Sequence, residues 1–175
     1  MTARAAVVLA LGSNLGDRLA NLQGGVDALC AGPGLDDVAL SPVYETVPVG
    51  GPAQADYLNA VLTAATSLSA RGVLDRALAA EAAQGRVRAE RWGPRTLDVD
   101  VIAYDDAVSG DPELTLPHPR AHERAFVLAP WHDLDPEAAI PGHGRVADLL
   151  AATGTDGLRR LRDTWLRAPS PGGRA

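Results

Sequence analysis

The chain has 175 residues, 46% of them hydrophobic, and a formal charge of -6. This length is typical of one globular domain, and the acidic balance argues against a general binder of nucleic acids or anionic membranes. The one cysteine excludes an intramolecular disulfide framework, and no lysine is present to serve a P-loop or a Schiff base. No apolar run approaches the roughly 20 residues that span a bilayer. We therefore expect a single cytoplasmic domain over residues 1–160, acting as a monomer, and a flexible tail over 161–175.

The apolar pattern predicts six elements in the order strand, helix, strand, strand, helix, strand. A buried strand over Ala5–Leu11 ends at turn residues, and Asp17 is suited to cap the helix that follows. The other four are strands over Val38–Thr46 and Tyr57–Thr66, a helix over Ser69–Gln84, and a strand over Leu97–Tyr104. This order is typical of a ferredoxin-like α+β sandwich, an antiparallel sheet flanked by helices. A hairpin near 105–115 and short helices near 123–134 and 146–152 are expected to follow.

An arginine-rich loop directly precedes two aspartates on the last of these strands. Its basic residues lie within ten positions, with one tryptophan among them: Arg86, Arg88, Arg91, Trp92 and Arg95. Asp98 and Asp100 are two residues apart on a strand, so both carboxylates project from one face. Adjacent carboxylates repel unless a cation lies between them, and Mg²⁺ prefers carboxylate and phosphate oxygens. The segment indicates magnesium-dependent phosphate chemistry, although a bare Asp-x-Asp is more often an ordinary solvated strand face.

Three further residues are weaker candidates. Tyr57 and Asn59 share the strand face opposite the core row, where an aromatic ring and an amide could hold a flat heterocycle. Such a pair is more often ordinary sheet packing. His118 lies between two prolines, close to several arginines, and a lone histidine of this kind is more often structural than catalytic.

Four segments, taken together, resemble the 6-hydroxymethyl-7,8-dihydropterin pyrophosphokinase family. They are LALGSNLGDR (9–18), SPVYETVPVGGPAQADYLNAV (41–61), GRVRAERWGPRTLDVDVIAYDD (85–106) and LTLPHPRAHERAFVLAP (114–130). The resemblance implies a ferredoxin-like fold and transfer of pyrophosphate from MgATP to the pterin hydroxymethyl group, with release of AMP, in folate biosynthesis. Pro119 stands where some members carry an aromatic residue, and the chain from about Thr155 matches no segment of the family.

The resemblance also implies roles for individual residues. Asp98 and Asp100 would hold two Mg²⁺ ions, while Arg86 and Arg95 would neutralise charge on the transferring phosphates. Residues implied to contact ATP are Glu81, Arg88, Arg91, Trp92, Val101, Thr115, His118 and Arg124. Residues implied to contact the pterin are Thr46, Pro48, Val49, Tyr57, Asn59, Trp92 and Phe126. Trp92 would fold over the site when the arginine loop closes.

Two other functions remain open from the residues alone. Another magnesium-dependent phosphoryl or nucleotidyl transferase would need a third carboxylate or a basic groove for a long substrate, and the acidic composition counts against the groove. A non-catalytic ferredoxin-like module that binds a ligand or RNA would need aromatic residues across its sheet. The chain has only seven aromatic residues, as Trp 3, Tyr 3 and Phe 1.

Overall fold

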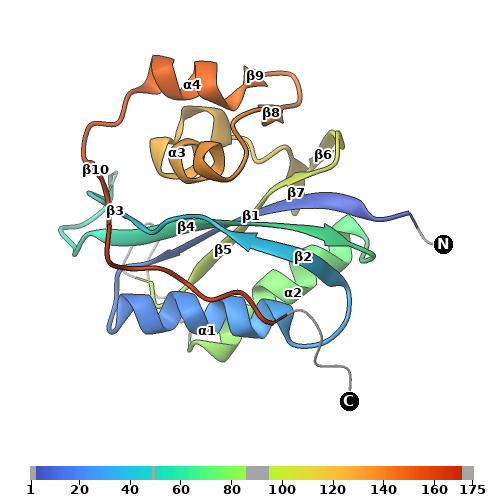
Figure 1. Ribbon diagram of the computed structural model, residues 1–175, viewed down its shortest axis with the longest axis horizontal. Helices are drawn as coiled ribbons and strands as arrows, with labels where there is room; N and C mark the ends of the chain where they lie inside the picture. Colours follow the sequence, from blue (N-terminus) through green and yellow to red (C-terminus); the bar gives the residue numbers. More distant parts are fainter. Residues whose placement is uncertain (1–2, 49, 86–94, 171–175) are drawn as a thin grey trace.

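A six-stranded antiparallel sheet forms the centre of the computed structural model, which describes residues 3–48, 50–85 and 95–170 (Figure 1). Strand β1 (Ala5–Ser13) pairs on one side with β4 (Tyr57–Thr66) and on the other with β5 (Asp98–Tyr104). The full order is β10-β3-β4-β1-β5, with β2 also paired to β4. With α1 (Arg18–Cys30) and α2 (Ala70–Ala83) as the connections, this confirms the ferredoxin-like α+β fold.

Helices α1 and α2 cover one face of the sheet; α1 is capped by Asp17 as expected, and α2 is capped by Ser69. The Asp17 carboxylate accepts a hydrogen bond from the Ala20 N–H at 3.0 Å, and the Ser69 hydroxyl accepts one from the Gly72 N–H at 3.0 Å. Apolar side chains at helical spacing meet alternate side chains of β1 and β4, forming the larger core: Leu9, Leu11, Leu22, Val26, Leu29, Leu58, Leu62, Val73 and Ala77. In the described ranges every helix is too short or too polar to cross a bilayer.

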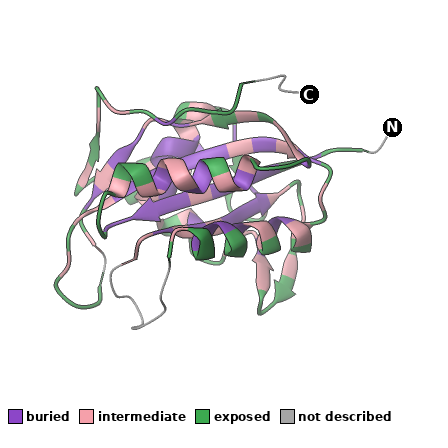
Figure 2. Ribbon diagram, turned by 90° about the horizontal axis from the view of Figure 1, so that it is seen from below, coloured by how far each residue is buried: buried purple, intermediate pink, exposed green. Residues whose placement is uncertain are grey.

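The opposite face carries a smaller core under α3 (Ala125–Leu134) and α4 (Val146–Thr153). Val61 and Ile102 from the sheet meet Leu128 and Trp131 from α3. The connecting segments contain β6 (Ser109–Asp111), β7 (Leu114–Leu116), the 3₁₀ helix η1 (Ala121–Glu123), β8 (Ala139–Ile140) and β9 (Gly144–Arg145). The central strands are therefore buried between two layers of helices (Figure 2).

The strand predicted over Val38–Thr46 is two strands, β2 (Leu35–Leu40) and β3 (Tyr44–Thr46). Pro42 has no N–H to donate to a strand ladder, so the regular pairing is interrupted there. The break is closed by Ser41, whose backbone N–H donates to Val61 O at 2.9 Å and whose hydroxyl accepts from the Val61 N–H at 2.8 Å. Both strands thereby stay on β4.

The segment after α4 returns to the sheet and then crosses α1. Strand β10 (Leu158–Arg160) pairs with β3, and Arg159 forms an ion pair with Glu45. Farther along, the Gln23 amide donates to Arg167 O at 3.0 Å and accepts from the Arg167 N–H at 2.8 Å, while Leu166 is buried in the larger core. Figure 1 shows this segment running along α1. The expected flexible tail over 161–175 therefore includes a packed stretch.

Candidate active site

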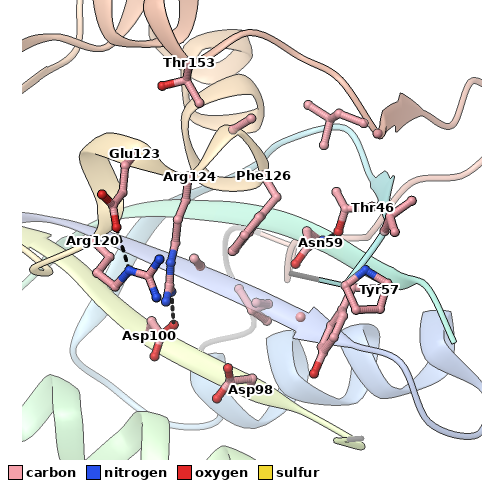
Figure 3. A pocket seen from close by; sticks show the side chains of 18 of the residues that line it. Thr46, Tyr57, Asn59, Asp98, Asp100, Arg120, Glu123, Arg124, Phe126 and Thr153 are labelled. Atoms are coloured by element: carbon pink, nitrogen blue, oxygen red, sulfur yellow. Dashed lines mark hydrogen bonds and ion pairs between the residues drawn. The ribbon is translucent and has the colours of Figure 1, made fainter. Parts of the chain in front are cut away.

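A pocket of about 650 Å³ lies between the sheet and α3 (Figure 3). Its floor is the end of β1, its two sides are β4 and β5, and the turn between α4 and β10 closes one end. Residues that line it include Gly12, Thr46, Pro48, Tyr57, Asn59, Arg95, Asp98, Asp100, His118, Arg120, Glu123, Arg124, Phe126, Asp156 and Leu158. The pocket therefore gathers residues from segments far apart in the sequence.

Asp98 and Asp100 project into this pocket from β5, while Val99 between them is buried in the larger core. Arg95 Nη1 lies 3.0 Å from Asp98 Oδ1, and Arg124 Nη1 lies 3.9 Å from Asp100 Oδ2. The pKa of Asp100 is raised to about 7, mainly because burial disfavours its charge and secondly because Asp98 repels it. The two nearby arginines therefore compensate the negative charge of the pair only in part.

The uncompensated negative charge of Asp98 and Asp100 is suited to a bound cation. Both carboxylates offer oxygen ligands on one strand face, which is the donor chemistry that Mg²⁺ prefers. Within the part of the chain that the structure describes, no group of three or more histidine, cysteine or acidic side chains is placed to hold a metal ion. A hard cation at Asp98 and Asp100 would thus need its other ligands from water or from a phosphate.

His118 lies beside Asp100 as a neutral imidazole. The pKa of His118 is lowered to about 4, mainly by burial and next by the positive charge of Arg124. The ring Nδ1 accepts a hydrogen bond from the Arg120 N–H at 3.2 Å, so the ring proton is on Nε2, which lies 3.9 Å from Asp100 Oδ2. The backbone N–H of His118 donates to Ile102 O at 2.9 Å and holds this loop against β5. His118 therefore presents a neutral N–H donor to the carboxylate end of the pocket.

The other end of the pocket is suited to a flat ligand. Tyr57 enters from β4 and Phe126 from α3, so aromatic rings lie on opposite sides of the space (Figure 3). Asn59 is buried, and its amide nitrogen donates to the Thr46 hydroxyl at 2.7 Å. The Arg124 guanidinium carbon lies 5.6 Å from the centre of the Phe126 ring and links this end to the carboxylate end.

The remaining residues predicted for the site fall into two groups. Arg86, Arg88, Arg91, Trp92 and Val49 lie outside the described residues. Glu81, Val101 and Thr115 are described but do not line the pocket. The Glu81 carboxylate is buried and accepts from the Val99 N–H at 2.8 Å, and the Thr115 hydroxyl donates to Asp111 O at 2.9 Å. Their contacts with ATP stay predictions.

A buried asparagine that was not predicted for the site, Asn14, joins two loops beside the pocket. The Asn14 amide nitrogen donates to Gln54 Oε1 at 2.8 Å and to Ala55 O at 3.0 Å, and its Oδ1 accepts from the Arg95 N–H at 2.8 Å. Its position directly after a buried strand was the one available signal. Gly12, Gln54, Arg120, Glu123 and the turn over 153–158 also line the pocket without having been predicted.

Comparison with known proteins gives consistent matches over nearly the whole chain. Residues 8–136 match the family described as 7,8-dihydro-6-hydroxymethylpterin-pyrophosphokinase (HPPK). The chain is 45% identical to the 2-amino-4-hydroxy-6-hydroxymethyldihydropteridine pyrophosphokinase of Methylorubrum extorquens, covering 87% of this chain and 96% of that one. It is 46% identical to the enzyme of the same name from Mycobacterium leprae, covering 94% of both chains.

The fold is also found among solved structures. Wild-type HPPK-DHPS of Plasmodium falciparum superimposes with a TM-score of 0.65 at 13% identity, covering 90% of this chain and 48% of that one. A variant of that protein solved with pterin gives a TM-score of 0.69 at 13% identity and covers 91% and 48%. This chain thus spans about half of those proteins, and at this identity the likeness concerns the fold.

Proposed function

The chain belongs to the 7,8-dihydro-6-hydroxymethylpterin-pyrophosphokinase family, and from this premise we propose how its pocket transfers pyrophosphate from ATP to 6-hydroxymethyl-7,8-dihydropterin. The reaction belongs to folate biosynthesis and releases AMP. The observation that carries the assignment of the site is that one pocket holds a carboxylate pair at one end and an aromatic slot with a buried amide at the other. The two ends match the two substrates of the family.

We place the ATP phosphates at the carboxylate end. Asp98 and Asp100 would hold two Mg²⁺ ions there, and the partly uncompensated charge of the pair supports this assignment. When bound, magnesium neutralises the phosphates and favours ionisation of the attacking hydroxyl. Arg95 and Arg124 lie beside the two aspartates and would contact the phosphate oxygens. His118 would add a neutral N–H donor, which can bind a phosphate oxygen without changing the net charge of the site.

We place the pterin at the aromatic end, with its ring between Tyr57 and Phe126. Stacking on both faces would orient the plane of the heterocycle. Because the Asn59 nitrogen is engaged by Thr46, its Oδ1 is the group suited to accept a hydrogen bond from an N–H on the pterin edge. The polar edge would therefore point toward Asn59 on β4, and the hydroxymethyl group toward β5.

In this arrangement the pterin oxygen attacks the β-phosphorus of ATP. A new oxygen–phosphorus bond forms, the bond from the β-phosphorus to the bridging α,β oxygen breaks, and AMP leaves with that oxygen. Arg95 and Arg124 would lie beside the phosphoryl oxygens on which negative charge develops, as electrostatic stabilisation of such a transfer requires. Residues proposed to complete this side of the site are Arg86, Arg88, Arg91 and Trp92. The cytoplasmic location and monomeric state stay predictions.

The test is AMP release from MgATP with and without the dihydropterin, in wild type and in Asp98→Ala. AMP that requires the pterin and is lost in the variant is the expected result. A matched control is Asp106→Ala, because Asp106 is an exposed aspartate two residues beyond the end of β5. AMP formed equally without pterin would contradict the function, and full activity of Asp98→Ala would contradict the site.

A further inference from the structure

The register of the sheet places Gly12 directly between the two ends of the pocket. Gly12 is paired with Asn59 on β4 and with Asp98 on β5, so the three residues form one row across three strands. The next row is Val61, Ala10 and Asp100. Directly opposed residues of antiparallel strands project to the same face. The pocket floor between the Asn59 amide and the two aspartates is therefore made by Gly12 and Ala10.

The reason for a glycine at position 12 is the lack of space for a side chain and not the backbone conformation. Gly12 lies within β1, and it is not among the described glycines that have positive φ. A Cβ atom there would lie 3.0 Å from Asn59 Oδ1 and 3.5 Å from Tyr57 Cδ1. The Asn59 amide has little room to move away, because it is buried and bonded to the Thr46 hydroxyl at 2.7 Å.

We propose that Gly12 is a positioning residue for the transfer. Its bare backbone lets the single exocyclic carbon of the pterin lie flat across β1, so that the hydroxyl reaches the phosphates above Asp98. Two strand spacings separate the Asn59 and Asp98 backbones, a span of about 10 Å. A bicyclic heterocycle with a one-carbon arm can bridge this span only if no side chain rises from the middle strand. This inference rests on the proposed function of the same pocket.

Gly12→Ala is the direct test, with Gly110→Ala as its control. Gly110 is also in a strand, and a Cβ added to it meets no atom within 4 Å. We expect Gly12→Ala to weaken pterin binding and lower kcat/KM for the pterin by about tenfold or more. Its dissociation constant for a non-hydrolysable MgATP analogue should change less than about twofold, and Gly110→Ala should match wild type in both assays.

Two outcomes would overturn this role. An equal loss of nucleotide binding and pterin binding, with a lowered Tm, would show that Gly12 serves the fold alone. Unchanged pterin kinetics in Gly12→Ala would show that a methyl group on the floor does not obstruct the substrate. Wild-type protein that releases no pterin-dependent AMP would instead contradict the proposed function itself, so the two failures are distinguishable.

Discussion

Glu81 accepts a hydrogen bond from the backbone N–H of Val99, the residue between the two aspartates of the pocket, at 2.8 Å. β5 is an edge strand paired only with β1 in the described sheet, so this N–H has no strand partner. A buried side chain from α2 takes the place of the missing strand. Glu81 therefore holds the segment that carries Asp98 and Asp100, although it does not line the pocket.

Removing this acceptor should loosen the carboxylate pair. Glu81→Ala leaves a buried N–H unsatisfied, and we expect a loss of about 1–3 kcal/mol in the free energy of unfolding. Glu81→Gln keeps an acceptor oxygen on a side chain of the same length and should lose less stability. Urea denaturation measures the stability, and magnesium-dependent nucleotide binding measures the effect on the pair. Equal stability of Glu81→Ala and wild type would contradict this role.

The apo protein should respond to pH through Asp100. Its pKa is raised from 3.8 to about 7, mainly by burial and next by Asp98, so the folded state binds more protons than the unfolded state between these values. The contribution of Asp100 to stability is therefore fully present below about pH 4 and is lost as the pH rises toward 7.

His118 contributes with the opposite sign. Its pKa is lowered from 6.5 to about 4, so its contribution to stability is present above 6.5 and is lost as the pH falls through 4. Because the two contributions to stability have opposite signs, the contribution of Asp100 is measured by comparing wild type with a variant that lacks it. Thermal unfolding of wild type and Asp100→Asn without Mg²⁺ should show the variant gaining stability relative to wild type as the pH rises from 4 to 7. A constant difference over that range would contradict the raised pKa.

Substitutions of His118 should distinguish a hydrogen-bond donor from a general base. Gln supplies a neutral N–H, so His118→Gln should retain more activity than His118→Ala, for which we expect about a tenfold loss in kcat/KM for ATP. Any fall in wild-type activity near the usual histidine pKa should persist in His118→Gln, because it would arise from Asp100 and not from His118. A profile that falls below pH 6.5 in wild type and becomes flat in His118→Gln would identify His118 as a base.

The segment that crosses α1 should stabilise the fold. Leu166→Ala removes a buried side chain, and we expect a loss of about 2–3 kcal/mol in the free energy of unfolding, read as a lower Tm. Trp165 is the natural control, because 67% of it is exposed and Trp165→Ala should change stability by less than about 0.5 kcal/mol. Similar Tm values for wild type and Leu166→Ala would mean that this segment is dispensable.

Periodicity predicted most of the sheet and both capped helices. The predicted strand over Tyr57–Thr66 agrees with β4 at both ends, Asp17 caps α1 as expected, and the helix predicted over Ser69–Gln84 agrees with α2 to within one residue at each end. The packing of residues 161–167 was not predictable, because it depends on one leucine and on backbone hydrogen bonds to Gln23, neither of which produces a pattern.

For the site too, local sequence patterns predicted some residues and not others. The alternation of β5 was sufficient to place Asp98 and Asp100 on one face, and the family resemblance implied His118, Arg124 and Phe126, which all line the pocket. Gly12 and Asn14 were not predicted, since their surroundings are set by contacts between segments that are distant in the sequence. A glycine at a strand end has no local signal that separates a required gap from an ordinary turn.

In the proposed site, the pairing of β1 with both β4 and β5 would fix the distance between the two bound substrates. One strand step is about 3.3 Å, so a slip of a single residue between β1 and either neighbour would misplace one substrate by more than a bond-forming reaction tolerates. The same slip would turn every apolar side chain of that strand away from its core. Selection for a well-packed sheet would therefore also maintain the proposed alignment of pterin and ATP, even at positions that touch neither molecule.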